Sequence, residues 1–198
     1  ADRLDARHRA LGLVVLAVGL DQRDRLAVAE LAPQLLLEDL RVLRNHRADA
    51  CGVHDLRLRV LIPAVENSVS GTAMRPGDIF TSRKGLTVEI GNTDAEGRLV
   101  MADAMWYARK EYKPRAMVDI ATLTGSKVGA LGSYYAGLFT EDESLHSALL
   151  QAAKSSGEPL WRLPLSDEFA SELKSDVADL RNTGKTTGAS TAAWFLKQ

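Results

Sequence analysis

The first 60 residues of this 198-residue chain contain no lysine and no Phe, Trp or Tyr. Ten arginines lie there, whereas every lysine and every Phe, Trp and Tyr lies beyond position 60. A core-forming segment of that length without an aromatic residue is unusual. Three interpretations of residues 1–59 remain open: a helical arm, a divergent linker, or sequence read in a shifted frame of an arginine-rich coding region. The Leu-rich stretch 26–43 favours a helix interrupted near Pro33, and we expect residues 1–58 to pack poorly or to form an incidental helix.

Cysteine and long apolar runs are also scarce. The single cysteine, Cys51, excludes a disulfide within the chain and fits a reducing compartment. The longest apolar run, 11–20, is too short to span a bilayer. Charged residues follow it where a signal peptide would have a small-residue cleavage site, so we expect a cytoplasmic protein without a membrane partner. The chain begins with Ala instead of Met, which favours a fragment or a processed product.

Charge of one sign is not in excess, because the formal net charge is −1. Without a basic stripe, nucleic acid is not an expected partner. The four histidines show no metal-ligand spacing and are expected to be structural or at the surface. They are His8, His46, His54 and His146.

From residue 60 onward, strand and helix patterns alternate. The sequence predicts a strand over 60–62, a hairpin from 79–81 and 86–90, a helix over about 98–112, a strand over 116–121, a helix over about 144–155 and a last helix after Gly188. Pro114 is expected to end the first helix. Strand, helix and strand with connections of this length predict an α/β domain with a parallel strand pair.

Two carboxylates, Asp94 and Glu96, stand one residue apart on the connection between the predicted strand and helix. In an extended backbone residues i and i+2 point to the same side, so these side chains are expected to converge. Two carboxylates held that close require a cation such as Mn²⁺, Mg²⁺ or Zn²⁺. Arg98, at the helix start, would favour an oxyanion. The alternative is a solvated acidic loop with Arg98 in a surface ion pair.

The segment 92–99, Asn-Thr-Asp-Ala-Glu-Gly-Arg-Leu, resembles the signature octapeptide of the leucyl aminopeptidase (cytosol aminopeptidase) family. Segments 62–67, 75–78, 119–125, 161–165 and 178–184 resemble the family in the same order, so the resemblance covers about residues 60–198. It implies a truncated catalytic domain, a three-layer αβα fold with a central, largely parallel sheet. It also implies two divalent metal ions, Mn²⁺ or Zn²⁺, peptide substrates, a role in peptide catabolism and assembly as a hexamer.

The resemblance assigns roles by position. Asp94 would bind one metal through its side chain and backbone carbonyl, and Glu96 would bridge both metals. Arg98 would be the catalytic residue that holds a bicarbonate-like anion. The pocket for the first side chain of the substrate would be lined by Thr122, Leu123 and Gly125.

One part of the family pattern is absent. The family also has an upstream stretch with two lysines and a Phe-Asp-x-Gly-Gly run, and residues 1–60 contain neither lysine nor Phe. Lys84 and Lys127 do not align with the family lysines and are interpreted as structural. Two functions therefore remain open. One is a metal-dependent aminopeptidase of the leucine type with part of its active site missing, and the other is a non-catalytic subunit that acts as a structural or interaction module.

Overall fold

The computed structural model describes residues 11–18, 56–63, 65, 69–186 and 188–198, with 11–18 and 56–60 given by their backbone. The fold divides into two compact units. The first takes residues up to 70 together with 99–122, and the second takes residues 71–98 and 123–198. The predicted helix over 26–43, Cys51 and three of the four histidines lie outside the described residues.

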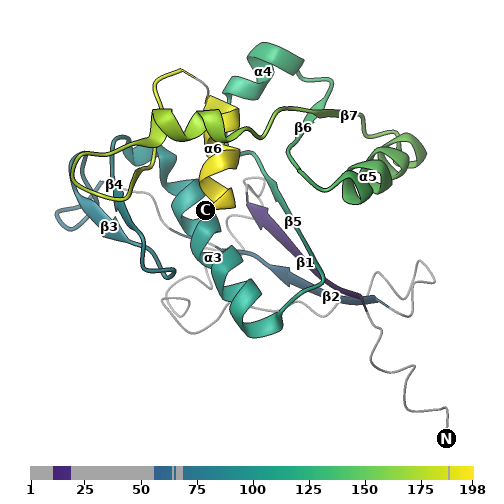
Figure 1. Cartoon of the computed structure of the whole chain (residues 1–198), viewed down its shortest axis with the longest axis horizontal. Helices are drawn as coiled ribbons and strands as arrows, with labels where there is room; N and C mark the ends of the chain where they lie inside the picture. Colours follow the sequence, from purple (N-terminus) through teal and green to yellow (C-terminus); the bar gives the residue numbers. More distant parts are fainter. Residues whose placement is uncertain (1–10, 19–55, 64, 66–68, 187) are drawn as a thin grey trace, which may run out of the picture. The chain divides into compact units, whose positions relative to one another are not determined.

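The first unit is built on a three-stranded, all-parallel sheet (Figure 1). Its strands are β1 (Leu11–Val18), β2 (Leu56–Leu61) and β5 (Ala116–Ala121), in the order β2-β1-β5. Val15 of the central strand lies opposite Val60 of β2 and Val118 of β5. Strand β1 was not predicted. Its place at the centre of this sheet differs from the expectation that residues 1–58 pack poorly.

Helix α3 (Glu96–Tyr112) supplies residues 99–112 to this unit and packs through small residues. Ala104 and Ala108 are four residues apart and therefore share a helix face, which is buried against Leu61 at the end of β2. Partly buried Met105, Tyr107, Tyr112 and Met117 surround this cluster. The helix ends before Pro114, as predicted, and Lys113 turns the chain with a φ of 45°.

The second unit contains the predicted hairpin. Strands β3 (Ile79–Thr81) and β4 (Thr87–Glu89) pair antiparallel, and β8 (Leu180–Arg181) runs parallel to β4. The turn before the hairpin closes with a hydrogen bond from the Asp78 N–H to the Arg75 carbonyl, and Gly77 there takes a φ of 95°. The sheet order is therefore β3-β4-β8.

The remaining elements of the second unit are helices and two short strands. They are η3 (Thr93–Ala95), α4 (Ser126–Leu131), β6 (Ala136–Leu138), α5 (Glu143–Ser156), β7 (Leu160–Arg162), η4 (Asp167–Leu173) and α6 (Gly188–Lys197), with β6 and β7 parallel. Asp142 caps the N-terminus of α5, and its carboxylate accepts a hydrogen bond from the Leu145 N–H. Gly157 caps the C-terminus with a φ of 76°. The α/β class and the helices over 96–112, 143–156 and 188–197 confirm the sequence predictions.

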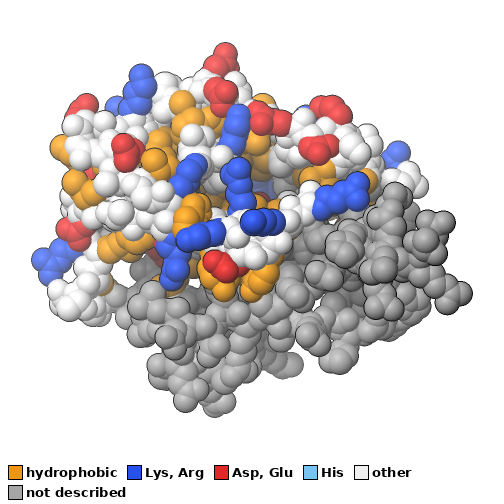
Figure 2. Space-filling view, turned by 60° about the horizontal axis from the view of Figure 1, so that its bottom comes forward, with side chains coloured by type: hydrophobic (Ala, Val, Ile, Leu, Met, Phe, Trp, Pro, Cys, Tyr) orange, Lys and Arg blue, Asp and Glu red, His pale blue; other side chains and the backbone are white. Residues whose placement is uncertain are grey.

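Among the helices of the described residues, none combines the length and apolar character needed to cross a bilayer. On the face shown in Figure 2, Lys and Arg side chains lie among Asp, Glu and apolar ones.

Candidate active site

The octapeptide 92–99 connects the end of β4 to α3, as the sequence predicted. Its first residue, Asn92, has an extended backbone, and its side chain accepts a hydrogen bond from the Asp94 N–H at 2.9 Å. This cap starts the short 3₁₀ helix η3, which runs directly into α3. The cap therefore determines where the backbone leaves the extended conformation.

The backbone between the two carboxylates is not extended, so that premise of the convergence argument is wrong. Asp94 lies in η3 and Glu96 is the first residue of α3. Residues i and i+2 of a helix do not face each other, which separates the environments of the two side chains. Asp94 is exposed, whereas one Glu96 carboxylate oxygen, Oε2, is buried and has no hydrogen-bond partner among the described residues.

Arg98, in the first turn of α3, is 6% exposed. Two buried donor atoms, Nε and Nη1, have no hydrogen-bond partner within the described part of the chain. Burial lowers the pKa of the guanidinium, and the negative charge of Glu96 opposes that shift. Arg98 is therefore not in a surface ion pair, which contradicts the alternative interpretation of this loop. Its free N–H groups can donate hydrogen bonds to an anion, and the free Glu96 oxygen can bind a cation.

Three predicted pocket residues follow β5. Leu123 approaches the octapeptide, because a Cβ added at Gly97 would lie 3.1 Å from Leu123 Cδ1. Gly125 caps the start of α4, and a Cβ there would have no neighbour within 4 Å. Thr122 is exposed and belongs to the first unit, at the end of β5. The second unit thus brings Leu123 to Gly97, and the pocket itself stays a prediction.

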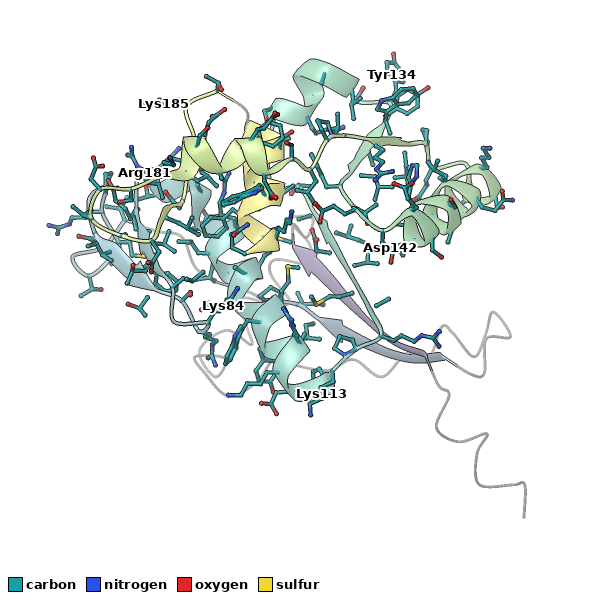
Figure 3. The ribbon with its side chains drawn as sticks, viewed as in Figure 1. Lys84, Lys113, Tyr134, Asp142, Arg181 and Lys185 are labelled. Carbon is teal, nitrogen blue, oxygen red and sulfur yellow. The ribbon has the colours of Figure 1, made fainter. Side chains whose placement is uncertain are left out.

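Residues of β8 and the segment before it support the strand that leads into the octapeptide. Asp179 accepts hydrogen bonds from the N–H and the hydroxyl of Thr87, at 2.8 and 2.7 Å, and these bonds lower the pKa of its carboxyl. Arg181, labelled in Figure 3, places Nε 3.5 Å from Oε2 of Glu89. Sequence reasoning gave these residues no role. The sequence feature that could have pointed to them was their position in the segment 178–184, which resembles the family.

Asn182 is a further residue that the sequence did not identify. It is fully buried, and its side chain contacts the backbone of residues 91–95. The sequence feature that could have pointed to it was again its position in the segment 178–184 that resembles the family, because its partners lie about 90 residues away in the sequence.

Other candidates have structural roles. Lys127 donates to the carbonyls of Gly132 and Tyr135, which supports its structural interpretation. His146 lies within 3.6 Å of Glu143, beside Arg162. Across the described residues, no group of three or more His, Cys, Asp or Glu side chains is placed to hold a metal ion.

Residues 44–198 match the family described as "Cytosol aminopeptidase family, catalytic domain". This chain belongs to the cytosol aminopeptidase family. We expected the resemblance to start at about residue 60, and the family match starts earlier, at residue 44. The division of the chain into 1–59 and 60–198 stays a prediction.

Two curated relatives show how much of a cytosol aminopeptidase this chain covers. It is 55% identical over 159 residues to probable cytosol aminopeptidase 1 of Shewanella oneidensis, and the aligned residues make up 79% of this chain and 32% of the relative. It is 54% identical over 144 residues to the probable cytosol aminopeptidase of Chlorobaculum tepidum, 72% of this chain and 29% of the relative. The chain therefore spans roughly a third of these relatives.

A solved structure shows that the fold of this chain likewise corresponds to part of a larger protein. A mutant of tomato leucine aminopeptidase matches with a TM-score of 0.80 and 37% identity, over 96% of this chain and 37% of that chain. The α/β fold of this chain is thus the fold of part of a leucine aminopeptidase.

Proposed function

We propose that this chain supplies the carboxylate and arginine part of an aminopeptidase active site, which releases N-terminal amino acids of the leucine type from peptides. One observation carries the proposal. A buried Glu96 oxygen and two buried Arg98 donors, all without partners among the described residues, sit in the octapeptide of a catalytic-domain family. Buried polar atoms are normally hydrogen-bonded, so unpartnered ones in the first turn of α3 suggest groups reserved for a ligand. Family membership favours this function over a non-catalytic subunit.

The donor set fits a hard divalent cation in part. Asp94 and Glu96 would each offer carboxylate oxygens, the ligand type that Mn²⁺ prefers and Zn²⁺ accepts, although the helical backbone does not turn the two side chains toward each other. When bound, such ions supply Lewis acidity toward a peptide carbonyl and lower the pKa of water. The described residues contribute two carboxylates, fewer than the two ions of the family scheme require. We therefore propose that residues beyond the described ones complete the site.

Arg98 would hold a bicarbonate-like anion through Nε and Nη1. A fixed guanidinium keeps its charge at any working pH, so Arg98 would orient the anion and would not itself take up a proton, and an anion held there would supply general-base chemistry. Leu123, packed toward Gly97, would present an apolar wall to the first side chain of the peptide, together with Gly125 and Thr122. An apolar wall excludes water and favours leucine-like residues.

The cellular setting follows from the relatives' names and stays part of the proposal. Two relatives are named cytosol aminopeptidases, which supports a cytoplasmic role in peptide catabolism. Assembly as a homo-oligomer, a hexamer in the family, is likewise proposed.

A chimera tests the proposal. The segment of the Shewanella relative that matches this chain is replaced by the corresponding segment of this chain, after the relative itself is shown to hydrolyse leucine anilide with Mn²⁺. We expect the chimera to hydrolyse it, and Arg98→Ala to lower kcat by about 10²-fold, within the range for general acid–base groups. The exposed N-cap variant Asp142→Asn, which preserves the cap, is the control. A folded but inactive chimera would contradict the proposal.

A further inference from the structure

The buried side-chain amide of Asn182 forms hydrogen bonds to the backbone of residues 91–95, a segment called the acidic loop below. Oδ1 of Asn182 accepts hydrogen bonds from the N–H groups of Gly91 and Asn92, at 2.8 and 3.2 Å. Nδ2 donates to the carbonyls of Asn92 and Ala95, at 2.7 and 3.4 Å. Two acceptor sites and two donors are the whole capacity of an amide. The reverse orientation would set donors against N–H groups, so the partners determine which way the amide points.

The strand pairing explains why this amide lies at the loop. Strand β8 runs parallel to β4 with Arg181 opposite Glu89, and the next residue, Asn182, donates its N–H to the Glu89 carbonyl at 3.0 Å. Both strands therefore end at the same edge, where sites of α/β proteins form. Gly91 allows the close approach, because a Cβ there would lie 2.9 Å from Thr183 Cγ2.

We propose that Asn182 is a positioning residue for the cation-binding carboxylates, acting only through the backbone of the acidic loop. Its bonds to Asn92 and Ala95 hold the backbone on both sides of Asp94, and the Ala95 contact lies directly before Glu96. The Asn92 side chain holds the Asp94 N–H from within the loop. A loop ordered in advance binds a cation without the cost of ordering it. This inference rests on the proposed metal-dependent function.

Two variants separate the donors from the acceptors. Asn182→Asp has nearly the same shape and keeps both acceptor bonds, but it loses both donors and places a carboxylate oxygen against the carbonyls of Asn92 and Ala95. Asn182→Ala loses all four bonds. Leu173→Ala is the control, because Leu173 is fully buried in the same unit and its apolar side chain forms no hydrogen bond to the loop. Asn182→Ser retains one donor and serves if the other variants fail to fold.

The test uses the whole chain, with Mn²⁺ alone as the probe in calorimetry and with amide hydrogen exchange of residues 91–95. Loss of a direct hydrogen-bond partner of a metal ligand typically lowers metal affinity by about 10–100-fold, and Asn182, which acts through the backbone, should give the lower end of that range, about 10-fold. We expect that loss in both Asn182→Asp and Asn182→Ala, and a smaller one in Asn182→Ser. Exchange of the Gly91 and Asn92 amides should accelerate more in Asn182→Ala than in Asn182→Asp. Leu173→Ala should leave Mn²⁺ affinity within about twofold of the parent value.

Several outcomes would overturn the inference. One is parent-like Mn²⁺ affinity in both folded Asn182→Asp and Asn182→Ala. Another is an equal loss in Leu173→Ala, because a general loss of stability would then explain the effect. If the parent chain binds no Mn²⁺, the proposed metal function fails. The positioning role is then decided by exchange alone, and unchanged exchange of residues 91–95 in Asn182→Ala would refute it.

Discussion

Replacing Arg98 by methionine should stabilise the fold. Arg98 is 6% exposed, and its buried Nε and Nη1 have no hydrogen-bond partner among the described residues. A buried donor left without a partner costs about 1–3 kcal/mol. Methionine retains much of the apolar stem and carries no donor, so Arg98→Met removes that cost while largely preserving the packing.

The attraction between Arg98 and Glu96 opposes this gain. Burial is the larger of the two influences on the pKa of Arg98, and Glu96 is the smaller. We therefore expect a net gain of about 1–2 kcal/mol in the free energy of unfolding. That corresponds to a rise in Tm of about 2–8 °C for a chain of this size. The double variant Arg98→Met with Glu96→Gln should gain at least as much, because it also removes the charge of Glu96, whose buried Oε2 has no hydrogen-bond partner among the described residues.

The assay is urea unfolding followed by circular dichroism, with and without bicarbonate. An anion that binds only the folded parent chain stabilises it by mass action, and the variant should lose that dependence. Arg162→Met is the control, because Arg162 donates to Glu143 at 2.6 Å and to the Thr140 carbonyl at 2.9 Å, so its loss should lower stability. If Arg98→Met lowers stability by more than about 1 kcal/mol and the double variant does not recover it, the Arg98 donors are partnered and the reasoning fails.

Three further outcomes concern the rest of the chain. Leu61→Ala should lower the free energy of unfolding by about 2–5 kcal/mol in urea titration, because Leu61 is fully buried in the first unit. Val15→Pro should make strands β1 and β2 more sensitive to limited proteolysis, because proline removes a ladder donor from the central strand β1, and a digestion pattern like the parent's would contradict that strand. Bonds from Thr87 lower the pKa of Asp179 below its usual 3.8, so its ionised form stabilises the fold above pH 3.8. That stabilisation is lost as pH falls through the lowered pKa, and Asp179→Asn should flatten this part of an acid-unfolding curve.

Local signals predicted much of the fold. The turn at Pro76-Gly77 and the hairpin after it follow from backbone constraints on adjacent residues, and Pro114 marked the end of α3. Strand β1 was missed because its partners β2 and β5 are distant in sequence. Its apolar run, with Val14 and Val15 at its centre, is the usual pattern of a buried parallel strand.

The sequence singled out Glu96 and Arg98 through the octapeptide, and their roles stay predictions. It did not predict the local geometry, because the Asp94 N–H bonds to the Asn92 side chain and starts a 3₁₀ turn where an extended backbone was expected. Contacts of Asn182 join residues about 90 positions apart, and no local pattern encodes such a pairing. Burial of Arg98 is likewise a tertiary property.

Titration of the chain with Mn²⁺ tests the central claim most directly. We expect weak binding, because two carboxylates hold a hard ion loosely and it keeps most of its waters. Asp94→Asn and Glu96→Gln should each abolish this binding, whereas Asp142→Asn, in an N-cap away from the octapeptide, should leave it unchanged. Tight binding that survives both Asp94→Asn and Glu96→Gln would place the cation elsewhere and contradict the account.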